Sequence, residues 1–77
     1  MKVKVKVYSG SKYNPGSEKT AEGTYNITSY EVREIPDEEI YAMGFNETDP
    51  CGEYLILTFP NRETATFRNS MCDMFRL

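Results

Sequence analysis

The sequence predicts a mainly β protein with one short helix, built as a small antiparallel, curled five-stranded sheet or as a partly open barrel. Three observations favour this fold class. Valine and lysine alternate along the first segment, later segments are rich in β-branched and aromatic residues, and turn signals separate these segments at short intervals. At 77 residues the chain has room for one domain, residues 1–77, with a compact core and modest stability.

The amino-terminal segment, Met1 to Tyr8, has the period-2 pattern of a strand with one buried face. Its alternating residues are Lys2, Val3, Lys4, Val5, Lys6 and Val7. The segment from Ser9 to Ser17 then contains glycine, asparagine and proline, the residues that favour turns. We therefore expect a strand followed by a surface loop.

A long second strand is expected from Thr20 to Ile35, where β-branched and aromatic residues are frequent. The apolar phase slips after Ile27, which predicts a bulge or bend near Thr28-Ser29. Pro36 ends this strand because proline has no amide hydrogen to donate and fixes its own φ.

A short helix of about two turns is predicted after Pro36. Three acids follow this proline, and negative charge is favoured at a helix amino terminus. Gly44 suits the left-handed residue that ends a helix, and Phe45 after it is placed to pack back on Ile40, as in a Schellman motif.

The remaining chain predicts three closely spaced strands. Glu53 to Phe59 has apolar residues on both faces and belongs inside the sheet. Pro60-Asn61-Arg62 makes a tight turn into Glu63 to Arg68, so these two strands form an antiparallel hairpin. Met71 to Leu77 is the last strand, joined to the hairpin by a single helical turn.

The expected core combines the apolar residues of all these strands with two residues of the helix. The strand residues are Val3, Val5, Val7, Ile27, Val32, Leu55, Leu57, Phe59, Phe67 and Phe75. Ile40 and Met43 are expected to pack the helix against them.

The chemistry that the sequence offers argues against an enzyme. There is no histidine, which removes the usual base for serine and cysteine nucleophiles and the commonest metal ligand. Cys51 and Cys72 alone make an incomplete zinc site. The glycines form neither a phosphate-binding loop nor a dinucleotide fingerprint. We therefore expect no catalytic residues, cofactor or metal.

The sequence also predicts a soluble, cytoplasmic protein. Its longest apolar run is Tyr54-Leu55-Ile56-Leu57, far short of the ~20 residues that cross a bilayer. The alternating amino terminus does not resemble a secretory signal. Both cysteines are then expected to be free thiols, because a reducing cytosol opposes disulfides.

Charge is distributed unevenly along the chain. Residues 1–20 contain five lysines and one acid, a net +4, and residues 21–60 contain one arginine and nine acids, a net −8. Residues 61–77 carry a net +1, which gives the total of −3. The central segment therefore contains nine of the twelve acids.

Acids with embedded aromatic residues suit a partner with a basic surface, because charge raises the encounter rate and a buried tyrosine supplies affinity. The simpler interpretation is that the acids only keep the protein soluble while Ile40 and Phe45 belong to the core. The expected partner-binding residues are Asp37, Glu38, Glu39, Tyr41, Glu47, Asp49 and Glu53.

Two alternative functions remain. The row formed by Lys2, Lys4 and Lys6 could follow a phosphate backbone in a nucleic-acid-binding accessory protein. The same row could instead protect an edge strand from pairing with other chains. The second alternative is a small structural subunit that self-associates.

The closing stretch, Thr64 to Ser70 followed by Met74 to Leu77, resembles the hairpin-and-turn ends of many small β proteins. The short acidic chain is also similar in style to the small accessory proteins of phages and other bacterial mobile elements. Together with the acidic segment, this leads us to expect a cytoplasmic protein-binding domain that covers a basic surface of a host enzyme. The resemblance leaves the partner and the oligomeric state open.

Overall fold

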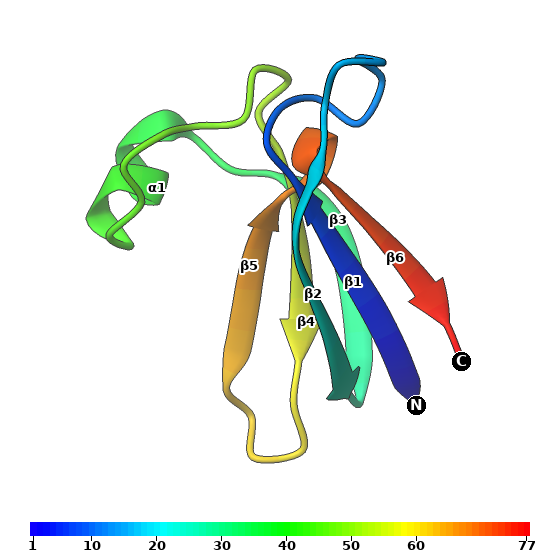
Figure 1. Ribbon diagram of the computed structural model, residues 1–77. Helices are drawn as coiled ribbons and strands as arrows, with labels where there is room; N and C mark the ends of the chain where they lie inside the picture. The colour runs from blue at the N-terminus through cyan, green and yellow to red at the C-terminus, as the bar shows by residue number, and fades with distance from the viewer.

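The computed structural model describes residues 1–77 and is mainly β, which confirms the predicted fold class. Six strands form two three-stranded antiparallel sheets, ordered β2-β1-β6 and β3-β4-β5, and the two sheets do not close into a barrel (Figure 1). The elements are β1 (Lys2–Tyr8), β2 (Lys19–Asn26), β3 (Ser29–Glu34), α1 (Asp37–Ala42), β4 (Glu53–Thr58), β5 (Thr64–Arg68), the single-turn 3-10 helix η1 (Asn69–Met71) and β6 (Cys72–Arg76).

The predicted long second strand is divided into β2 and β3, so six strands replace the expected five. The amide of Ile27 donates to the carbonyl of Met1 at 2.8 Å, and the next amide, that of Thr28, donates to the carbonyl of Thr58 at 2.8 Å. The chain therefore passes from the first sheet to the second within two residues. This is the bend that the slip in apolar phase predicted.

The main core lies between the two sheets. Val3 and Val5 of β1 are buried in it together with Leu55 and Leu57 of β4, and Ile27 is buried at the bend. Cys72 of β6 completes this cluster, with Val7, Phe59 and Phe67 partly buried against it. The alternation in β1 thus places its valines inward, as predicted.

A second, smaller core lies on the other face of β4. Tyr54 and Ile56 pack there with Ile35 and with Ile40 of α1, and Phe45 covers their margin, its ring 6.4 Å from that of Tyr54. Burial of apolar residues on both faces of β4 agrees with the predicted position inside a sheet.

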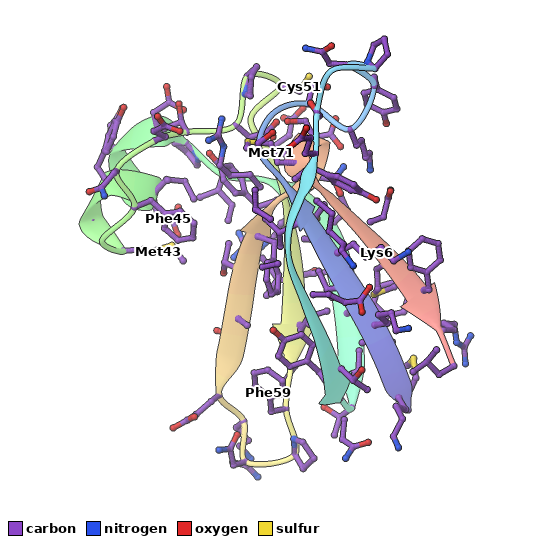
Figure 2. The ribbon with its side chains drawn as sticks, viewed as in Figure 1. Lys6, Met43, Phe45, Cys51, Phe59 and Met71 are labelled. Atoms are coloured by element: carbon purple, nitrogen blue, oxygen red, sulfur yellow. The ribbon has the colours of Figure 1, made fainter.

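The end of α1 has the predicted Schellman geometry. Gly44 has a φ of 96°, and its amide donates to the carbonyl of Tyr41 at 3.0 Å. The amide of Phe45 donates to the carbonyl of Ile40 at 3.3 Å, and the two side chains belong to the same cluster. Figure 2 labels Met43 and Phe45 at this end of the helix.

Three residues of the expected core are instead largely exposed, namely Val32 (48 %), Phe75 (45 %) and Met43 (48 %). Val32 lies on β3, an edge strand that nothing covers on its free side. Phe75 pairs with Lys4 and therefore shares the outer face of the first sheet with the lysines. Met43 follows the last turn of α1, where only Ile40 points into the core.

Candidate interaction surfaces

The acidic surface is carried by α1, which stands to one side of both sheets (Figure 1). Asp37, Glu38 and Glu39 form its first turn and are exposed, while Ile40 anchors the helix inward. None of these three carboxylates takes part in the four ion pairs of the structure. Their negative charge is therefore not compensated within the chain.

Two large apolar side chains lie exposed at the other end of the same helix. Tyr41 is 55 % exposed, and Met43 follows it two residues later. Sequence reasoning assigned Met43 to the core and so missed it as a surface residue. We use the name α1 surface for Asp37, Glu38, Glu39, Tyr41 and Met43.

Glu47 lies near the main body and not on the α1 surface. Its Oε2 accepts a hydrogen bond from Nη1 of Arg68 at 2.8 Å, which joins the connection after α1 to β5. The charge of Glu47 is thus already paired within the chain.

Asp49 is 3 % exposed, and its carboxylate is used in hydrogen bonds within the fold. Its Oδ1 accepts bonds from the amide of Ser70 at 3.0 Å and from the Ser70 hydroxyl, and its Oδ2 accepts the amide of Cys51 at 2.9 Å. Its own amide donates to the hydroxyl of Tyr54 at 2.8 Å. Burial by itself raises the pKa of Asp49, but these hydrogen bonds outweigh it, so the pKa lies below the usual aspartate value.

Glu53 is half-buried and stands opposite Glu34 in the β3–β4 ladder. Neither carboxylate has an ion-pair partner. Sequence reasoning missed Glu34, because its place beside Glu53 depends on strand register. The pair adds negative charge near the end of β3 that leads into α1.

The largest hollow, of ≈ 430 Å³, is lined by Glu34, Ile35, Pro36, Cys51 and Gly52. It brings one carboxylate and one exposed thiol to the same open surface. The chain has no histidine that could serve as the base to activate this thiol.

The lysine row lies on the outer face of the first sheet, and β1 is the central strand of that sheet. The idea that these lysines protect a free edge is therefore wrong. Nζ of Lys6, which is labelled in Figure 2, lies 5.2 Å from the centre of the exposed Phe75 ring, a cation–π arrangement. Asp73 and Glu22 stand opposite Lys6 on the two neighbouring strands, so this face carries both signs of charge.

The fold and these surfaces define a small, open, two-sheet β domain with an acidic helix on one side and a lysine-bearing sheet face on the other. Comparison of the chain with protein-family models, with curated proteins and with solved structures finds no match. No helix is long and apolar enough to cross a membrane.

Proposed function

We propose that this domain binds a protein with a basic surface through the α1 surface, and that it works by binding rather than by catalysis. One observation carries the proposal. The three carboxylates in the first turn of α1 have no ion-pair partner, and the exposed ring of Tyr41 lies on the same helix. Long-range attraction by the three carboxylates raises the encounter rate, and burial of an aromatic side chain supplies affinity.

Of the contact residues that the sequence suggested, the proposal retains those whose carboxylate or ring is free to meet a partner. The centre of the proposed interface is formed by Asp37, Glu38, Glu39 and Tyr41. Glu34 and Glu53 add negative charge beside it. Glu47 and Asp49 are left out because the first is paired with Arg68 and the second is buried. A cytoplasmic protein of this kind, like the accessory proteins of phages, would act by covering a basic surface of a host enzyme.

The proposal is tested by affinity capture from a bacterial lysate, with the parent and two matched triple variants as bait. Asp37→Lys, Glu38→Lys and Glu39→Lys together reverse the α1 charge, whereas Lys2→Gln, Lys4→Gln and Lys6→Gln together remove the lysine row. We expect the first variant to lose the captured protein and the second to retain it. Retention by the α1 variant and loss by the lysine variant would refute the proposal.

Nucleic-acid binding is the second candidate, and the central position of β1 favours it. Lys2, Lys4 and Lys6 project from the middle of a sheet face that also exposes Phe75, a ring on which a base could stack. The test is binding of labelled single-stranded DNA and RNA across a salt series. Affinity that falls with salt and disappears when the three lysines are replaced by glutamine would support this candidate, and no binding at low salt would exclude it.

A further inference from the structure

β3 is an edge strand whose free side is open. It pairs with β4 on one side only, and all six of its residues are exposed. Tyr30 and Val32 are large apolar residues that are nonetheless exposed, at 42 % and 48 %. An uncovered strand of this kind is a template for pairing with another strand.

The register shows which backbone groups are free. The amide of Ile35 donates to the carbonyl of Gly52 at 3.1 Å, which continues the β3–β4 ladder by one residue. Hydrogen-bonded positions alternate in an antiparallel ladder, so the odd-numbered residues of β3 bond to β4. The amides and carbonyls of Tyr30, Val32 and Glu34 therefore point to the free side.

The side chains on either side of Val32 carry opposite charges. Glu31 and Arg33 share the outer face of β3, and Nε of Arg33 lies 3.3 Å from Oε1 of Glu31. If a second copy pairs antiparallel about Val32, Glu31 of each chain stands opposite Arg33 of the other. Both contacts fall at the non-hydrogen-bonded positions, where facing side chains come closest.

Other registers and other edges lack this complementarity. Centring the pair on Glu31 or on Arg33 sets like charges opposite each other, which is unfavourable. In the edge strands β2, β5 and β6, no residue whose backbone amide and carbonyl point to the free side has an acid before it and a base after it, or the reverse. The charge pattern thus singles out one strand and one register.

We propose that two copies of this chain associate through antiparallel pairing of their β3 strands about Val32. The product is a continuous six-stranded sheet in the order β5-β4-β3-β3-β4-β5, with the two Val32 residues side by side. The proposal rests on β3 alone and does not depend on the function proposed for α1.

The test is sedimentation velocity of the full chain from micromolar to millimolar concentration, with charge variants of β3. Arg33→Glu and Glu31→Arg each create two like-charge contacts and should weaken the dimer by about tenfold or more. The double variant, Glu31→Arg with Arg33→Glu, restores both contacts and should dimerise like the parent. An equal mixture of the two single variants should form a heterodimer.

Two further variants control for folding and for general charge effects. Val32→Pro removes an amide that points to the free side and should abolish the dimer while leaving the β3–β4 ladder intact. Glu22→Arg removes the exposed ion pair with Lys19 on β2 and should leave dimerisation unchanged. A parent that stays monomeric at all concentrations, or a double variant that fails to recover, would overturn the proposal.

Discussion

The carboxylate of Asp49 joins two segments that are distant in the sequence, the turn at Cys51 and the 3-10 helix at Ser70. Asp49→Ala should destabilise the protein by roughly 2–3 kcal/mol, because buried donors that bonded to a charged acceptor lose their partner. The measurement is denaturant unfolding at neutral pH. Glu22→Ala is the control and should cost at most about 1 kcal/mol, because it removes only an exposed ion pair with Lys19.

The same residue predicts a pH dependence. Because the folded-state pKa of Asp49 lies below its unfolded value, the ionised carboxylate contributes stability above the unfolded pKa, about 4. That contribution is lost as the pH falls through the folded pKa. Asp49→Ala should therefore flatten the acid limb of the stability profile. Parallel profiles for parent and variant below about pH 4 would show that Asp49 is not responsible.

The two cysteines should differ in reactivity. Burial raises the pKa of the Cys72 thiol to about 11, so it stays protonated at neutral pH, whereas Cys51 is exposed. Alkylation of the native protein without reductant should add one label, at Cys51, and unfolding should permit the second. Two labels on the native protein would contradict the burial of Cys72. A species that takes no label even when unfolded would show a disulfide.

At the scale of the elements, β4 contributes buried side chains to both hydrophobic cores, one on each of its faces. Leu57→Ala should cost about 2–5 kcal/mol through lost burial and a residual cavity. Val32→Ala on the neighbouring β3 should cost at most about 1 kcal/mol, because that side chain is half exposed in the monomer. Unfolding midpoints in denaturant measure both. Equal losses in the two variants would contradict the division into a central and an edge strand.

The elements that could be predicted from sequence are those fixed by local chemistry. Alternation placed Val3 and Val5 inward, and Gly44 marked the end of α1. The errors concern whether the face of a strand is buried. Periodicity assigned Val32 and Phe75 to faces of their strands, but whether another layer covers a face depends on tertiary packing, which local pattern does not contain.

The candidate site shows the same limit. Exposure of Asp37, Glu38 and Glu39 follows from their place in a first helical turn, and the sequence indicates it. Asp49 looks like one more surface acid in the sequence, because its buried partner Ser70 lies 21 residues further along the chain. Contacts across that separation depend on how the two sheets meet.

At the scale of the whole molecule, the fold keeps the two charged regions of the sequence on different elements. The negative charge is concentrated on α1 and near Glu34 and Glu53, while the lysine row lies on the outer face of the first sheet. A partner can therefore approach the acidic side without meeting the lysines. Steering by such a surface depends on ionic strength, because salt screens charges beyond about 10 Å at 0.1 M.

The most direct test of the proposed function is the association rate of the captured partner, measured by stopped flow across a salt series. The parent should associate fast at low salt and slow steeply as salt is added. Reversing the charges of Asp37, Glu38 and Glu39 should lower the low-salt rate and remove most of the salt dependence, whereas Tyr41→Ala should mainly speed dissociation. An association rate that the charge reversal leaves unchanged, with the same salt dependence as the parent, would contradict the account.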